Sequence, residues 1–251
     1  MHRAHRDYGD TVMSTLAHTA EFTRTALHDA TTALLTPNIH LAQAVISRHT
    51  EADALLDGLD EWALKLTARP SKTDLAALAS AIRISADIEH MANLAVGIAK
   101  VARLRYQEPV IPAELCDALH VRCRAAADCA GRLARSLGSQ NPYIGPTIRN
   151  DYNTLDHAHR DLLTTLTAPI TPYPITTSID AILVAGYYKH FADHATAATH
   201  RAISVLNQWA DTSDVTSRCD PVPSTGTSRS SAAARRGHSA SLTRLDPATC
   251  G

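Results

Sequence analysis

This chain contains one stretch twice, as Ser85-Ala-Asp-Ile-Glu-His-Met-Ala-Asn-Leu-Ala-Val-Gly-Ile-Ala-Lys100 and as Ala185-Gly-Tyr-Tyr-Lys-His-Phe-Ala-Asp-His-Ala-Thr-Ala-Ala-Thr-His200, at an offset of 100 residues. The aligned pairs include His90 with His190, Met91 with Phe191, and Ala95 with Ala195. Both copies are rich in Ala, which favours helix, and we expect Met91 and Phe191 to face a core. A long internal repeat predicts a chain of two similar halves.

Apolar residues recur at helical spacing in six segments that proline-containing turns separate. The predicted helices are residues 7–35, 39–68, 74–106, 113–137, 143–168 and 175–209. Asn38 is predicted to cap the second helix. Three helices joined by short turns form an antiparallel bundle, and the last three repeat the order of the first three. The sequence therefore predicts an all-α fold of two tandem three-helix bundles, residues 1–108 and 109–210.

The core is expected to be built from small aliphatic side chains. Hydrophobic residues make up 45% of the chain, but aromatic residues only 4%. Such a composition suits closely packed helices. Cys116, Cys123 and Cys129 are spaced by 7 and 6 residues on one predicted helix, too widely for a Cys-x-x-Cys metal site. We expect them to be buried, reduced thiols.

Residues 211–251 differ in composition from the rest of the chain. Ser, Thr, Arg, Pro and Gly dominate there, and apolar residues are few. Such a segment buries too little surface to offset the entropy of ordering it, so it is predicted to be a disordered tail. Its arginines are sparse and interrupted, which favours a plain extension over a basic binding arm.

The charge of the chain argues against nucleic acid and membrane partners. The formal net charge is -1, from 24 basic and 25 acidic residues. This gives no large electrostatic footprint for nucleic acid or an anionic membrane. The amino terminus carries charges where a signal peptide needs an apolar segment, and no apolar run reaches the length of a membrane span. We therefore expect a cytoplasmic protein without membrane insertion.

The motifs of common enzymes are missing from the sequence. There is no Gly-rich phosphate loop, no nucleophile elbow and no Glu-x-x-His pair of the di-iron type. His157 and His159 are two residues apart and so point to different faces of a helix. We expect a protein that is not an enzyme.

The ionisable groups of the repeat are the candidate binding residues. Residues four apart stack on one helix face, so Glu89 lies over Asn93 and Lys189 over Asp193. The Lys189 ammonium group is expected to pair with Asp193. Acidic residues elsewhere could add outer ligands or form a solvated face: Asp53, Asp57, Asp60, Asp151, Asp156 and Asp161.

A second arrangement in the repeat could hold a cation. His190, Asp193 and His194 stand at i, i+3 and i+4, so two imidazoles and a carboxylate could converge. In the first copy only His90 with Asp87 remains of this pattern. Histidines that are solvated or hydrogen-bonded beside Asp193 are the favoured alternative.

These features resemble the PhoU family, and the string Phe-Ala-Asp-His-Ala from Phe191 is similar to its actinobacterial PhoY branch. The resemblance covers about residues 5–210. It implies two tandem three-helix bundles with a Glu/Asp-x-x-x-Asp motif on the third helix of each, whose carboxylates bind iron, zinc or another divalent cation. This chain keeps Glu89 and Asp193 but has Asn93 and Lys189 at the paired positions. With their neighbours Asp87, His190 and His194, the retained carboxylates form the predicted metal set.

The resemblance also implies a function in phosphate signalling. It implies a homodimeric adaptor that links a phosphate ABC transporter to a sensor histidine kinase and represses the phosphate-starvation response. Two alternatives stay open: a metal-binding helical bundle for storage or sensing, and a diverged paralogue that keeps only dimerisation.

Overall fold

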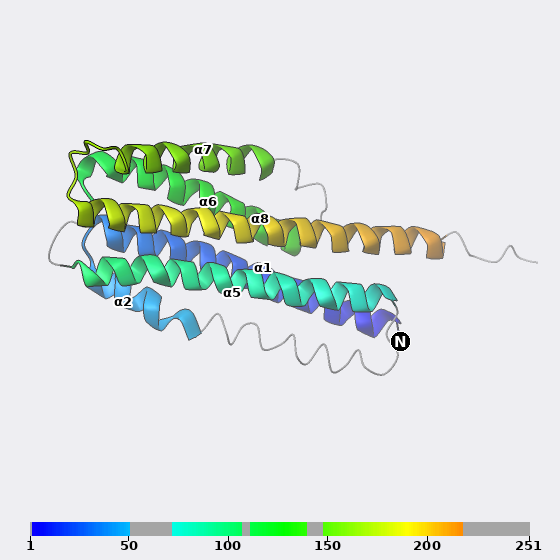
Figure 1. The fold of residues 1–251 in the computed structure, drawn as a ribbon. Coiled ribbons are helices and arrows are strands. Elements are labelled where there is room, and N and C mark those ends of the chain that lie inside the picture. Colours follow the sequence, from blue (N-terminus) through cyan, green and yellow to red (C-terminus); the bar gives the residue numbers. More distant parts are fainter. Residues whose placement is uncertain (1, 51–71, 107–110, 140–147, 218–251) are drawn as a thin grey trace, which may run out of the picture.

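The computed structural model describes residues 2–50, 72–106, 111–139 and 148–217, and in these ranges it contains helices and turns but no strand. Figure 1 shows the helices side by side. They are α1 (His2–Leu35), α2 (Ile39–Ser47), α5 (Lys72–Leu104), α6 (Ala113–Ser139), α7 (Ile148–Leu166) and α8 (Ile175–Ser217). The predicted all-α fold is confirmed. None of the described helices is both long and apolar enough to cross a membrane.

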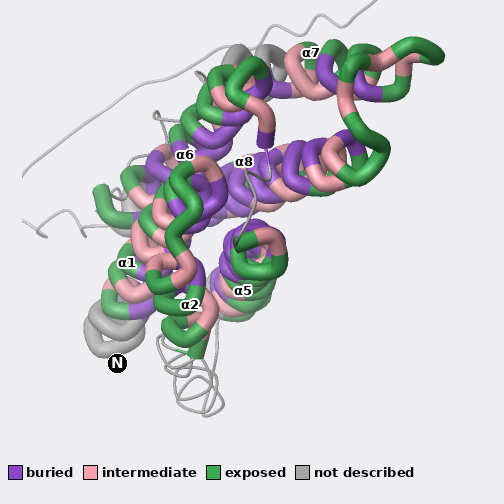
Figure 2. The backbone as a smooth tube through the Cα atoms, turned by 90° about the vertical axis from the view of Figure 1, so that its left-hand side faces the viewer, coloured by how far each residue is buried: buried purple, intermediate pink, exposed green. Residues whose placement is uncertain are grey.

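Four long helices form the centre of the molecule, and two shorter ones cover it. In the order α1, α5, α8, α6 each long helix packs on the next, and α6 packs on α1. The helices α1, α2 and α5 contact one another, as do α6, α7 and α8, which gives the two predicted three-helix bundles. Figure 2 shows α2 and α7 on opposite sides of this array, with buried residues on the inward helix faces.

The predicted start of α2 at Asn38 is confirmed. Asn38 has an extended backbone, with φ -128° and ψ 92°, and its side chain accepts a hydrogen bond from the Leu41 N–H at 3.0 Å. This bond satisfies one of the amide groups that a helix start leaves free. After Ser47 a turn at Arg48 interrupts the helix that was expected to run to residue 68. Residues 51–68 of that prediction lie outside the described part of the chain.

The tail begins later than the composition predicts. The structure continues α8 to Ser217, whereas the tail was expected to start at residue 211. The chain has no proline or glycine between Gly186 and Pro221, so nothing interrupts the helix in its polar last turns. Residues 218–251 lie outside the described part.

One apolar core extends through both halves. Its members come from all six described helices, among them the fully buried Met91 and Phe191, as predicted. Cys123 and Cys129 are buried free thiols and Cys116 is half-buried. The boundary predicted at residue 108 falls in 107–110, outside the described residues, so the division into two domains stays a prediction.

Candidate functional site at the paired repeats

The two copies of the repeat pack against each other along a seam between α5 and α8, which run in opposite directions (Figure 1). The pairs across this seam are Asp87 with Arg201 and His194, Gly97 with Tyr187, and Arg105 with Asp180. The sequence predicted the two helices but not that they meet. Of the candidate residues, Asp87 and His194 therefore lie at the contact between the halves.

An ionic cluster around Asp87 forms one end of this seam. The Asp87 side chain is only 12% exposed, and it accepts hydrogen bonds from Arg201 and from Nδ1 of His194, the latter at 3.0 Å. Since a carboxylate only accepts, the proton lies on His194 Nδ1. The His90 ring stacks at 5.0 Å from the His194 ring, and its Nδ1 lies 2.7 Å from the Ala86 carbonyl oxygen. Asp87 thus receives its neutralising charge from α8.

The equivalent position in the second copy makes an aromatic contact farther along the seam. Tyr187 corresponds to Asp87 in the repeat, and its ring lies on Gly97 of α5. A Cβ atom at Gly97 would lie 3.0 Å from Cζ of Tyr187, closer than ordinary van der Waals contact. The seam therefore has ion pairs toward both of its ends and an aromatic ring packed on a glycine between them.

The second motif is an ion-pair cluster between α8 and α7. Lys189 Nζ donates to both oxygens of Asp193, at 2.8 and 3.0 Å, as predicted. The same Nζ lies 3.9 Å from Oδ1 of Asp156 on α7, and Arg160 pairs with Asp156. His190 Nδ1 lies 3.6 Å from Oδ2 of Asp193. Lys189 therefore stands between two carboxylates from different helices.

The first motif has a different environment. Glu89 and Asn93 both lie exposed on α5. The Arg160 hydrogen bond lowers the pKa of Asp156, with Lys189 adding to the effect, so this carboxyl is charged at neutral pH. Of the acidic residues considered as outer ligands, Asp156 reaches the second motif, whereas Asp161 is exposed. The side chains of Asp53, Asp57, Asp60 and Asp151 lie outside the description.

The five residues of the predicted metal set are divided among three places. Glu89 is exposed on α5, Asp87 pairs with His194, and His190 lies beside Asp193. In the described ranges, no three His, Cys, Asp or Glu side chains form a group that could hold a metal ion. This arrangement does not fit a multinuclear cation site. Whether the chain binds a metal ion stays a prediction.

A buried arginine near this cluster was not predicted. Arg122 of α6 is only 4% exposed and donates to the carbonyl oxygen of Ala158 on α7. Burial lowers its pKa. The pKa of the nearby His159 is lowered, first by burial and then by the charges of Arg122 and Lys189. The helical spacing could have predicted that Arg122 is buried, because it lies between Leu119 and Ala126 on the apolar stripe of α6.

A second polar contact lies inside the core. The hydroxyl groups of Thr31 on α1 and Tyr188 on α8 are 2.8 Å apart, and the Thr31 hydroxyl donates to Sγ of Cys123 on α6 at 3.2 Å. Burial raises the pKa of both Cys123 and Tyr188, so neither group ionises at neutral pH. This contact joins three long helices and has the character of a structural hydrogen-bond network.

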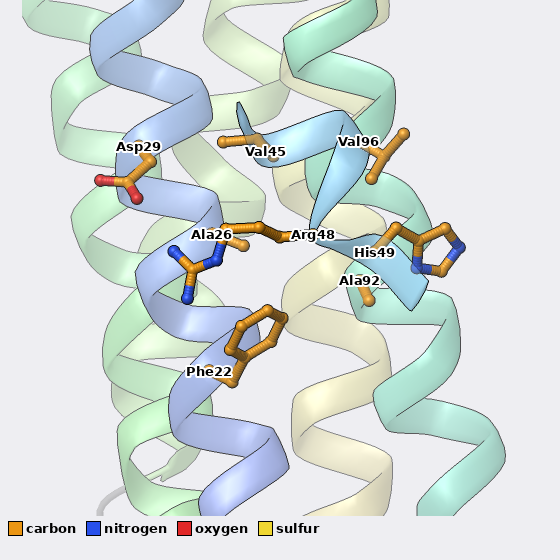
Figure 3. A pocket seen from close by; sticks show the side chains of 8 residues that line it. All are labelled: Phe22, Ala26, Asp29, Val45, Arg48, His49, Ala92 and Val96. Atoms are coloured by element: carbon orange, nitrogen blue, oxygen red, sulfur yellow. The ribbon is translucent and has the colours of Figure 1, made fainter. Parts of the chain in front are cut away.

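A small pocket lies between α1, α2 and α5, away from the seam (Figure 3). The Arg48 guanidinium group stands over the Phe22 ring at 5.0 Å. The lining residues are Phe22, Ala26, Asp29, Val45, Arg48, His49, Ala92 and Val96. The described chain stops at residue 50, immediately beside it, and its lining is mostly apolar.

Comparisons with known proteins agree with this architecture. A profile of the PhoU domain matches residues 16–102. The phosphate-specific transport system accessory protein PhoU homolog 2 of Mycobacterium tuberculosis is 33% identical over 180 residues, which cover 71% of this chain and 84% of that protein.

Solved structures show the same fold. The crystal structure of PhoU from Pseudomonas aeruginosa superposes with a TM-score of 0.71 over 83% of this chain and 100% of that one, at 18% identity. The phosphate transport system regulatory protein PhoU from Streptococcus pneumoniae superposes with a TM-score of 0.69, over 81% and 97% of the two chains, at 17% identity.

Proposed function

The chain belongs to the PhoU family, and on that premise we propose that it serves as a cytoplasmic accessory protein of a phosphate-specific transport system. The observation that supports this most is the match to the mycobacterial accessory protein, which extends over 84% of that protein's length and through both halves of this chain. The function would be one of binding and regulation. It requires contact surfaces on the helices rather than a reaction centre.

The finer part of the proposal concerns the partners. We propose that a homodimer of the chain contacts the transporter and a sensor histidine kinase, and that this link represses the phosphate-starvation response when phosphate is plentiful. The support is the resemblance of the paired repeats to the family motif helices, together with the fold. A molecule with long exposed helix faces on two bundles has room for two partners at once.

A deletion strain tests the regulatory role. Deleting the gene should switch on a phosphate-starvation reporter in phosphate-rich medium, and the wild-type gene in trans should restore repression. A reporter that stays repressed in the deletion strain would show that the chain is not the repressor. Light scattering of the purified chain measures the proposed dimer separately.

Affinity capture separates the two levels of the proposal. Chain expressed at its native level and cross-linked in cells should retain transporter subunits and the kinase, compared with a tag-only control. Recovery of transporter subunits without the kinase would support the accessory role and contradict the kinase link. Recovery of neither would contradict both.

Metal analysis decides the alternative of a metal-binding bundle. That alternative requires iron or zinc at a defined stoichiometry in protein purified without a His tag. A content below about a tenth of an ion per chain would rule it out, because a structural or storage site is occupied in most molecules.

A further inference from the structure

We propose that the Lys189 ammonium group takes the place of a bound cation at the second motif, so that Asp156 and Asp193 form a closed ion-pair cluster with it that excludes divalent metal ions. The inference goes beyond the proposed function, since it assigns a role to a residue in which this chain departs from its family. It predicts that one substitution creates a divalent-cation site at this place.

The geometry places the ammonium group between the carboxylates. Lys189 Nζ lies within 3.0 Å of both oxygens of Asp193 on its own helix, and 3.9 Å from Asp156 of α7. An ammonium group is a compact cation with three donors, so it can face both carboxylates. A metal ion bound by the same oxygens would stand where Nζ now stands.

Among the side chains that the structure describes, the charges of this cluster balance without a metal ion. Asp156 and Asp193 carry two negative charges, and Lys189 and Arg160 carry two positive ones. Oxygen ligands attract a divalent cation when their own repulsion is unrelieved. Here Lys189 and Arg160 relieve that repulsion.

Burial strengthens the ion pairs that Lys189 makes with Asp156 and Asp193. The Lys189 side chain is only 16% exposed, compared with 34% for Asp193 and 31% for Asp156. Ion pairs are screened less as they become less exposed. The positive charge of Arg122 also acts on this region, as its effect on the pKa of His159 shows. A divalent ion would have to displace the largely buried Lys189 ammonium group.

The internal repeat supplies the substitution that tests the inference. Position 89 is the counterpart of position 189 in the first copy, and it carries Glu. Changing Lys189→Glu gives the second copy the residue type of the first and places three carboxylates together. The charge of the cluster then changes from balanced to strongly negative, which is the condition under which oxygen ligands bind Mn²⁺.

The experiment compares the wild-type chain with K189E and with K100E. Lys100 is an exposed lysine of α5, so K100E makes the same charge change away from the cluster. Thermal unfolding is followed by circular dichroism with and without Mn²⁺, and bound Mn²⁺ is counted by equilibrium dialysis. We expect no Mn²⁺ response in the wild type or K100E. In K189E we expect about one bound ion per chain and a rise in Tm of roughly 5 °C at saturation.

Two results would overturn the inference. One is stoichiometric Mn²⁺ binding by the wild type that D193N abolishes. The other is a folded K189E that neither binds Mn²⁺ nor gains stability from it. Adding D156N to K189E should remove the response, which locates the ion between α7 and α8. If K189E does not fold, K189Q removes the positive charge with less disturbance. A folded K189Q that shows no Mn²⁺ response would likewise overturn the inference. The reporter assay for the proposed function is independent of all these outcomes.

Discussion

Three aspartates along α8 and its neighbours obtain their counter-charges from the chain itself. Asp87 is paired by Arg201, Asp180 by Arg105 and Asp193 by Lys189. Removing a charge from water is costly, and a close partner offsets part of that cost. Deleting one partner therefore leaves an uncompensated charge in a place that is half-buried or buried. A double substitution that removes both members of one of these ion pairs should therefore lower the free energy of unfolding less than a substitution that removes one member alone.

His159 should make the stability of the protein depend on pH. Burial, followed by the charges of Arg122 and Lys189, lowers its pKa below the ordinary value of 6.5. The unfolded chain then binds the proton more readily, so the free energy of unfolding falls as pH is lowered through about 6.5. The change in Tm between about pH 7.5 and about pH 5.5 should be smaller in His159→Gln than in the wild type.

A matched substitution controls for the other histidines. His200→Gln changes an exposed residue of α8, so its Tm difference between the two pH values should equal that of the wild type within error. If His159→Gln and His200→Gln show the same pH dependence as the wild type, His159 does not contribute to it.

At the scale of the helices, the approach of α5 to α8 depends on Gly97. The ring of Tyr187 fills the space that a side chain at position 97 would need. Gly186, the residue next to Tyr187, has the opposite surroundings, since a Cβ there would meet nothing within 4 Å. Glycine is unfavourable in a helix, and each helical glycine therefore needs a reason. Packing against Tyr187 explains the glycine at position 97, whereas no contact explains the one at position 186.

The two glycines should respond to substitution with opposite signs. Gly97→Val should lower the free energy of unfolding by about 1–3 kcal/mol, because its methyl groups overlap the Tyr187 ring. Gly186→Ala should raise it by up to about 1 kcal/mol, the usual difference in helix propensity. Urea denaturation measures both. Tyr187→Ala combined with Gly97→Val should recover part of the loss, and a Gly97→Val protein as stable as the wild type would contradict the packing argument.

The helices themselves could be largely predicted from the sequence. Apolar spacing and prolines located α1, α5, α6 and the start of α8 because they act through the local backbone. The end of α8 was wrong by several residues. Composition indicates where a chain lacks apolar surface, but a helix already formed can continue into a polar segment until a breaker interrupts it.

At the scale of the whole molecule, the two halves share one apolar core. Leu27 of α1 and Leu119 of α6 are both fully buried in it, although they belong to different halves. The contacts α1 with α6 and α5 with α8 join the bundles along their lengths. A core that crosses the boundary couples the folding of both halves.

Substitutions in either half should therefore shift a single unfolding transition. Leu27→Ala and Leu119→Ala should each lower the free energy of unfolding by about 2–5 kcal/mol, since each leaves a cavity. Urea denaturation followed by circular dichroism should show one transition in both variants. Hydrogen exchange should show reduced protection in both halves in each case. A second transition that keeps the wild-type midpoint would mean that the halves unfold independently.

The sequence by itself determined the all-α class of fold, the positions of most of the described helices and the pairing of Lys189 with Asp193, because helices and pairs of this kind depend on residues close together along the chain. The tertiary structure alone decided that the two repeats meet, that Asp87 pairs with Arg201 across 114 residues, and that Lys189 also faces Asp156 of α7. Helical periodicity specifies which face of a helix is buried. It does not specify which helix covers that face, because many partners can bury the same apolar stripe. The candidate metal residues therefore looked like one set along the chain, and packing divided them among different partners.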